Sequence, residues 1–129
     1  MKVVYDEILR RFPEVRGQMR EDYLDLPYLQ MNCLAQWLQA LPPGAINPPL
    51  IGRVKSFFDW CEQQPAGADA SNDIYTMFVV GFYEKLFEAE VTHPLIAHLV
   101  SKDDLLRNAD YLKTWVGEDN FAKALRHFG

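Results

Sequence analysis

The chain has 129 residues, of which 49% are hydrophobic and 24% are charged, and its formal net charge is −5. This length suits a single domain over residues 1–129, and this composition excludes an intrinsically disordered chain and a membrane protein. The longest apolar run is far shorter than the roughly 18 to 20 residues that cross a bilayer.

Residues 2–12 have the period of a short amphipathic helix. Its predicted apolar face contains Val4, Ile8, Leu9 and Phe12. Asp6 and Glu7 fall where a secretory signal would need its apolar segment. We therefore expect a cytoplasmic protein that begins with a helix.

Two further helices are predicted before residue 42. Residues 14–23 are mostly polar, with apolar side chains only at four-residue steps, and predict a weak helix. Residues 26–41 predict a stronger one, because Pro27 suits a first helical turn and the apolar face is continuous. This face contains Leu29, Cys33, Leu34, Trp37, Leu38 and Leu41.

The segment 41–49 holds four prolines and a glycine, and we read it as an irregular loop within the domain. The next helix is predicted from Pro48 to about residue 63. Its inward face contains Leu50, Val54, Phe57, Phe58 and Cys61. Both cysteines, Cys33 and Cys61, lie on apolar faces, so we expect buried thiols and no disulfide.

The most apolar stretch, residues 72–91, predicts a central helix against which the other helices pack. Ser71 or Asn72 is expected to cap its first amides. Gly81 in its middle costs about 1 kcal/mol relative to alanine, so a close approach by another helix is expected there.

The remaining sequence predicts three more helices. Pro94 begins a short buried one, Ser101 with Asp104 resembles a capping box for residues 101–116, and Gly117 separates the last one, 119–128. No stretch alternates like a strand, so we predict an all-α bundle of six to eight helices around the central helix 72–91.

Sites for catalysis, metal ions or cofactors have weak support in the sequence. Glu90 and His93 have the Glu-x-x-His spacing of carboxylate-bridged metal sites, but no second copy exists. Glu84 and Glu88 share a helix face and could act as a carboxylate pair, although a solvated helix surface is the simpler reading. We therefore predict no catalytic, metal-binding or cofactor-binding residues.

Charge and aromatic residues are more informative about function. Residues 59–119 hold twelve acidic and four basic side chains, a balance of −8, which argues against a nucleic-acid partner and favours a basic protein partner. Tyrosine and tryptophan at the polar margins of helices are common interface anchors. The predicted partner-binding residues are Glu84, Glu88, Glu90, Tyr75, Tyr83 and Trp60.

Three motifs spread over most of the chain carry a resemblance: Phe12-Pro13-Glu14, Asn72-Asp73-Ile74 and Val80-Gly81-Phe82-Tyr83-Glu84-Lys85-Leu86. With them the chain resembles a group of small, uncharacterised helical bacterial proteins. Several members of that group look like immunity proteins encoded beside secreted toxins. The resemblance implies a non-catalytic binding protein.

Two functional hypotheses follow. The first is a protein-binding module, most concretely a cytoplasmic immunity protein that neutralises a cognate toxin by covering its active surface. The second is a small helical enzyme or ligand-binding domain with Glu84, Glu88 and His93 around a pocket. A toxin gene beside this one would favour the first hypothesis, and a bound metal or metabolite would favour the second.

Overall fold

The computed structural model describes residues 2–42, 44–69 and 72–128. Within these ranges it contains eight α-helices, joined by short 3₁₀ segments, and no strand. The all-α prediction of six to eight helices is confirmed. Ser71, one of the two predicted caps of the central helix, lies outside the described residues.

The first half of the chain forms three α-helices, α1 (Lys2–Arg11), α2 (Pro27–Gln39) and α3 (Pro48–Gln63). The predicted inward faces of α1 and α3 are buried. Asn47 caps α3 by accepting a hydrogen bond from the Leu50 amide at 3.1 Å. Both cysteines are buried free thiols, as predicted.

The weak helix predicted over residues 14–23 is absent, and two 3₁₀ turns, Pro13–Gly17 and Glu21–Tyr23, take its place. Val15 and Met19 are buried, whereas Tyr23 is only partly covered. With one apolar side chain in every four residues, the segment buries too little apolar surface to stabilise a regular helix. It therefore packs along the core as short turns.

The buried face of α2 differs from the predicted one at Leu29, which is exposed. Gln30 is buried in its place, and its side-chain amide donates to the carbonyls of Tyr23 and Leu24 at 2.6 and 3.0 Å. Helix α2 packs against both α1 and the central helix, so its apolar surface is wider than a single stripe.

The central helix covers residues 74–88 and has three consecutive parts: α4 (Ile74–Phe78), a π-helical turn (Val79–Tyr83) and a 3₁₀ turn (Glu84–Glu88). It is shorter than the predicted 72–91 at both ends. Asp73, and not Asn72, is the cap, because its carboxylate accepts from the Thr76 amide at 3.0 Å.

Residues just beyond Glu88 explain where the central helix ends. Ala89 is extended, and the 3₁₀ turn Glu90–Thr92 then leads into α5 (His93–Leu99). The Thr92 hydroxyl donates to the Leu86 carbonyl at 2.7 Å, and the His93 ring bonds the Phe87 carbonyl at 2.8 Å. These two side chains satisfy carbonyls that a helix end leaves open.

The predicted helix 101–116 is divided in two, α6 (Lys102–Arg107) and α7 (Ala109–Val116), and α8 (Glu118–Leu125) follows with a 3₁₀ turn, Arg126–Phe128. Ser101 caps α6 as predicted. The break falls at Asn108, whose side-chain amide donates to the Asp104 carbonyl at 2.9 Å and so competes with the helical backbone bonds.

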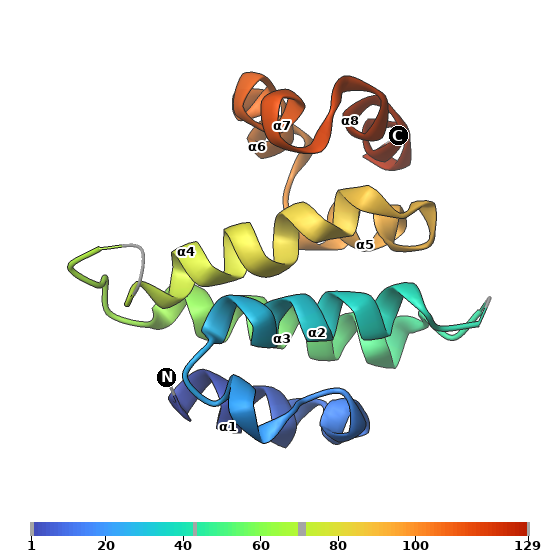
Figure 1. Cartoon of the computed structure of the whole chain (residues 1–129). Coiled ribbons are helices and arrows are strands. Elements are labelled where there is room, and N and C mark those ends of the chain that lie inside the picture. The colour runs from blue at the N-terminus through green and yellow to red at the C-terminus, as the bar shows by residue number, and fades with distance from the viewer. Residues whose placement is uncertain (1, 43, 70–71, 129) are drawn as a thin grey trace.

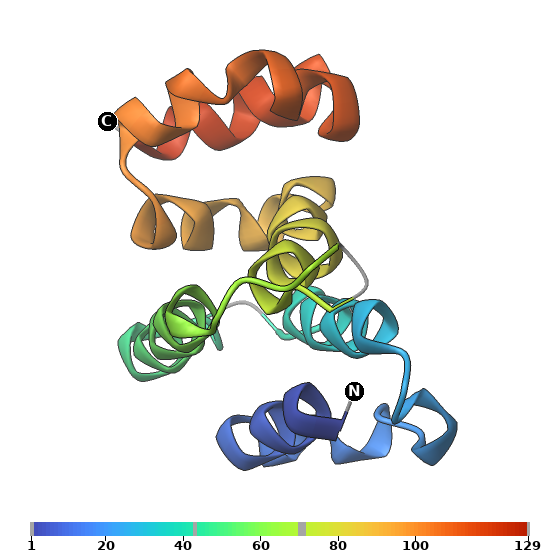
Figure 2. The same ribbon diagram turned by 90° about the vertical axis from the view of Figure 1, so that its left-hand side faces the viewer.

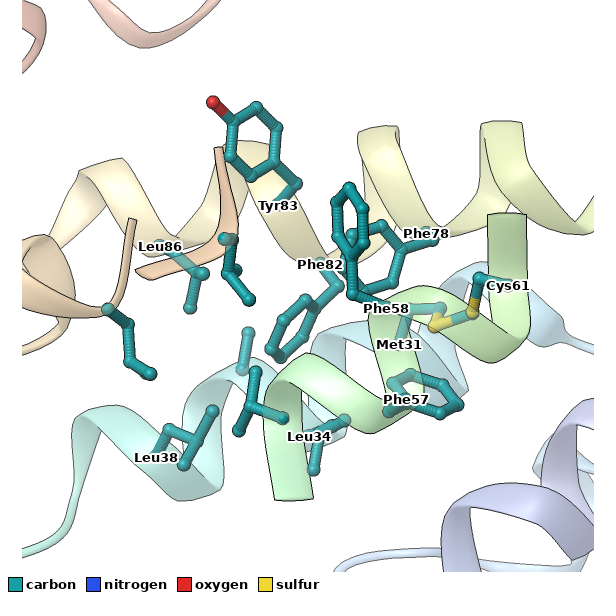
Figure 3. Packing of buried hydrophobic residues seen from close by; sticks show 14 of the residues in the cluster. Met31, Leu34, Leu38, Phe57, Phe58, Cys61, Phe78, Phe82, Tyr83 and Leu86 are labelled. Atoms are coloured by element: carbon teal, nitrogen blue, oxygen red, sulfur yellow. The ribbon is translucent and has the colours of Figure 1, made fainter. Parts of the chain in front are cut away.

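The helices stack in layers, with α1 at one end, α2, α3 and the central helix in the middle, and α6 to α8 at the other end (Figures 1 and 2). The two termini therefore lie at opposite ends of the stack. One continuous apolar cluster runs through all layers, from Val4 to Ala124. Figure 3 shows its centre, where Phe78 and Phe82 meet Phe58 and Met31.

Candidate functional site

A hollow lies between the central helix and the α6–α7 layer, and its volume is about 630 Å³. We call it the tyrosine hollow. Its lining comes from α3, the central helix and the segment 99–112. The lining residues are Lys55, Phe58, Glu62, Tyr75, Val79, Tyr83, Leu99, Val100, Ser101, Asp104, Asn108, Tyr111 and Leu112.

Tyr83 is the most buried tyrosine of this lining, with 8% of its surface exposed. In Figure 3 its hydroxyl points away from the apolar cluster, and it forms no hydrogen bond with a described residue. The hydroxyl oxygen is not one of the buried polar atoms that lack a partner, so it borders solvent in the hollow. Burial, with smaller contributions from Tyr75 and Asp104, raises the pKa of Tyr83, so the hydroxyl is neutral at physiological pH. It presents an unused donor and acceptor to the hollow.

The charged groups of the hollow are unevenly paired. The Lys55 ammonium lies 3.5 Å from the Asp59 carboxylate and 3.5 Å from the Leu99 carbonyl, and it also covers the Phe58 ring. Glu62 and Asp104 supply two carboxylates from opposite walls. Asp59 pairs with Lys55, and Arg107 pairs with Asp104 at 3.2 Å, so the remaining negative charge of the hollow comes from Glu62.

The Tyr111 hydroxyl donates a 2.5 Å hydrogen bond to the Glu84 carboxylate and so joins α7 to the central helix. This bond, together with burial, raises the pKa of Tyr111 to about 12. Tyr111 lines the tyrosine hollow, while Glu84 lines a second depression beside it. The bond is therefore a bridge between two adjoining recesses.

We call this second depression the tryptophan groove, and its volume is about 350 Å³. Its lining residues are Tyr28, Asn32, Val80, Gly81, Glu84, Lys85, Glu88, Trp115 and Val116. Trp115 is 68% exposed, and its ring lies 6.3 Å from that of Tyr111. The Asn32 side-chain oxygen is buried here without a hydrogen-bond partner among the described residues. The hollow and the groove together form what we call the α4–α7 face.

Four of the six predicted partner-binding residues meet on this face: Glu84, Glu88, Tyr75 and Tyr83. The other two lie elsewhere. Trp60 is partly buried in α3 and stacks on Phe57 with the ring centroids 6.0 Å apart. The Glu90 carboxylate pairs with Lys123 of α8 at 3.0 Å. Sequence periodicity placed the three aromatic residues near the polar margins of their helices, and the charge balance pointed to the three glutamates, but only the packing of helices decides which of them adjoin.

His93 does not join Glu84 and Glu88 in a pocket. Its ring is 1% exposed, donates to the Phe87 carbonyl and lies near the His127 ring, so it helps to close the end of the central helix. Within the described ranges, no three His, Cys, Asp or Glu side chains gather in a way that could hold a metal ion.

Trp115 and Tyr111 are site residues that the sequence reasoning missed. They stand four residues apart on α7, while the buried stripe of the α6–α7 segment runs through Leu105, Leu112 and Val116. An aromatic pair on the polar side of an amphipathic helix was the available signal, because side chains four apart share one face.

Comparison of the chain with protein-family models, with curated proteins and with solved structures finds no match. None of the described helices combines the length and the apolar content that a membrane crossing needs. The functional argument therefore depends on the α4–α7 face itself.

Proposed function

We propose that this protein is a protein-binding module that receives a basic partner on its α4–α7 face. The observation that carries the proposal is Trp115, which is 68% exposed at the edge of a groove that also contains Glu84 and Glu88. Tryptophan is among the residues that most often dominate binding energy at protein interfaces.

The charge distribution supports a basic partner. Residues 59–119 carry the balance of −8, whereas residues 1–58 come to +1 with seven basic and six acidic side chains. Four of the carboxylates of residues 59–119, on Glu62, Glu84, Glu88 and Asp104, line the α4–α7 face beside two lysines, Lys55 and Lys85. Excess negative charge at a binding face accelerates the approach of a positively charged protein and repels nucleic-acid phosphates. The face is thus suited to fast association with a basic protein domain.

In its most concrete form the proposal is a cytoplasmic immunity protein that covers the active surface of a cognate bacterial toxin. The resemblance described above supports this form, and a basic nuclease-like toxin domain would complement the acidic face. A toxin gene beside this one would support it directly.

The first test isolates the partner from the source cell by affinity capture and measures its association across a salt series. We expect the double variant Glu84→Lys/Glu88→Lys to slow association roughly tenfold or more at low salt and to flatten the salt dependence. The matched control, Asp6→Lys/Glu21→Lys, makes the same charge change on exposed residues at the α1 end of the stack. Equal effects of the two double variants would contradict a role for the α4–α7 face.

The same complex tests the aromatic anchor. Trp115→Ala should accelerate dissociation roughly tenfold or more, because an interface tryptophan typically contributes more than about 1 to 2 kcal/mol. Leu106→Ala, at an exposed apolar residue of α6, is the control and should change dissociation little. An unchanged dissociation rate in Trp115→Ala would remove the main support for the proposal.

A second candidate function is small-molecule binding in the tyrosine hollow. Its volume of about 630 Å³ falls in the range of ligand pockets, roughly 300 to 1,000 Å³. The version of this hypothesis that places Glu84, Glu88 and His93 around one pocket is not supported. Glu84 and Glu88 line the tryptophan groove, whereas His93 is buried at the end of the central helix. Mass spectrometry of the protein purified from source cells separates the two functions. A metabolite bound in a stoichiometric amount would favour small-molecule binding.

A further inference from the structure

We propose that the tyrosine hollow is a socket for one arginine side chain of the partner, whose guanidinium group enters between the central helix and α6. This inference rests on the proposed function and identifies the partner chemistry that the face selects. Three features of the hollow support it: a tyrosine hydroxyl without a hydrogen bond to a described residue, aromatic walls and two carboxylates that lie on different helices.

The Tyr83 hydroxyl is available to a group that enters the hollow. The Tyr83 residue is only 8% exposed, but its hydroxyl points away from the apolar cluster and no described residue forms a hydrogen bond with it. The hydroxyl oxygen is not one of the buried polar atoms that lack a partner, so it borders solvent in the hollow. An N–H donor that enters the hollow would therefore find this oxygen accessible.

The walls favour a flat cation. The rings of Phe58, Tyr75, Tyr83 and Tyr111 all line the hollow, and those of Phe58 and Tyr75 meet edge to face with centroids 6.4 Å apart. Tyr75 and Tyr111 remain 42% and 44% exposed, so they are the rings that an entering group can reach, whereas Lys55 already covers the ring of Phe58. A guanidinium group stacks on such rings and is less strongly hydrated than an ammonium group.

The acceptors of the hollow come from three different helices. Glu62 projects from α3, Tyr83 from the central helix and Asp104 from α6, so three oxygen-bearing groups line different walls of the hollow. Arginine has five N–H donors in fixed directions, whereas lysine concentrates its charge on one nitrogen. Lys55 does not oppose the cation strongly, since Asp59 and the Leu99 carbonyl already neutralise it.

The Asp104 carboxylate already accepts a guanidinium group. Arg107, one turn later on α6, donates to it at 3.2 Å, and both side chains are largely exposed. An exposed pair of this kind contributes about 0 to 1 kcal/mol, so it exchanges readily for an incoming arginine. The hollow therefore needs no rearrangement of the helices to admit the side chain.

The test uses isolated side-chain probes with the intact protein, followed by amide and tyrosine NMR signals. Nα-acetyl-arginine methylamide should bind with a Kd on the order of 1 mM and shift signals of residues that line the tyrosine hollow. Nα-acetyl-citrulline methylamide has nearly the same shape without the charge and should bind at least tenfold more weakly. The lysine analogue should fall between the two.

Two variants locate the binding. Tyr83→Phe should weaken arginine binding roughly tenfold, as expected for a hydrogen bond to a charged group, while leaving the melting temperature unchanged or raised. Glu62→Gln, at an exposed residue, should weaken it severalfold without affecting the fold. Tyr5→Phe is the control, because Tyr5 belongs to α1 and its hydroxyl faces the Met19 carbonyl at 3.5 Å.

Equal binding of the citrulline probe, unchanged binding in Tyr83→Phe, or signal shifts confined to other surfaces would each overturn the socket. These results leave the proposed function intact if Trp115→Ala still accelerates dissociation of the protein partner. Conversely, arginine binding in the hollow without any effect of Trp115→Ala would uphold the socket and contradict the wider protein-binding face.

Discussion

At the scale of single residues, the bond between Tyr111 and Glu84 connects two helices that the sequence separates by more than twenty positions. A hydroxyl that donates to a carboxylate is held in its protonated form, which is why the pKa of Tyr111 rises to about 12. The same bond fixes the ring of Tyr111 between the tyrosine hollow and the tryptophan groove. It therefore shapes both parts of the α4–α7 face.

We predict that Glu84→Gln returns the pKa of Tyr111 towards its ordinary value of 10.0. Because the pKa is raised in the folded state, the bond stabilises the protein fully below pH 10, and this contribution is lost as the pH rises through about 12. A tyrosine NMR titration measures the change.

Glu88→Gln is the control for this titration, because Glu88 also lines the tryptophan groove but its carboxylate pairs with Lys85 at 3.5 Å. The pKa of Tyr111 should stay near about 12 in that variant. If Glu84→Gln leaves the titration of Tyr111 unchanged, the carboxylate is not the cause of the raised pKa.

At the scale of elements, the central helix is positioned by its contact with α2. A Cβ atom added to Gly81 would lie 2.8 Å from the Met31 Cβ and 3.2 Å from the Tyr28 carbonyl oxygen. This confirms that another helix approaches closely at Gly81. The glycine lies inside the π-helical turn Val79–Tyr83, where the Glu84 amide bonds the Val79 carbonyl five residues back.

We predict that Gly81→Ala destabilises the protein by about 1 to 3 kcal/mol, because the overlap with α2 outweighs the gain of about 1 kcal/mol in helix propensity. Helix propensity alone would favour alanine at this position, and only the distance to Met31 reverses that expectation. Gly81→Leu should be more damaging still. Urea unfolding measures the change in the free energy of unfolding.

Gly52 offers a matched control within α3. A Cβ atom there meets no atom within 4 Å, so Gly52→Ala should stabilise the protein by up to about 1 kcal/mol through helix propensity. If Gly81→Ala and Gly52→Ala have the same free energy of unfolding, the close packing inferred at Gly81 is wrong.

At the scale of the whole molecule, a single apolar cluster connects layers that lie at opposite ends of the stack. Phe57 contacts Phe12 of the first helix and Phe78 of the central helix, with ring centroids 6.0 and 5.9 Å apart. Phe121 and Ala124 of α8 belong to the same cluster. Continuous burial of this kind couples the stability of the layers.

We therefore predict one cooperative unfolding transition for the chain. Trp37 and Trp60 report on α2 and α3, and Trp115 reports on α7, so tryptophan fluorescence and far-ultraviolet circular dichroism should give the same midpoint. The variant Trp37→Phe/Trp60→Phe keeps Trp115 as the single reporter. An earlier transition of Trp115 would show that the α6–α8 layer unfolds separately.

The sequence by itself determined the helical class, most helix positions and much of the core. Apolar residues at helical spacing in α1 and α3 are buried as predicted, because local periodicity directly sets which side of a helix excludes water. Caps such as Ser101 were also readable, since a capping bond joins residues only three positions apart.

Only the tertiary structure decided which helix margins meet. Glu84 and Trp115 share a groove, while Glu90 lies against α8, although Glu84 and Glu90 are only six residues apart in sequence. The position of Tyr83 in the wall of the tyrosine hollow was likewise not predictable, because the residues that line the hollow come from segments that are distant in sequence. Helical periodicity gives the direction of a side chain around its own axis, whereas a binding face requires the relative placement of several axes.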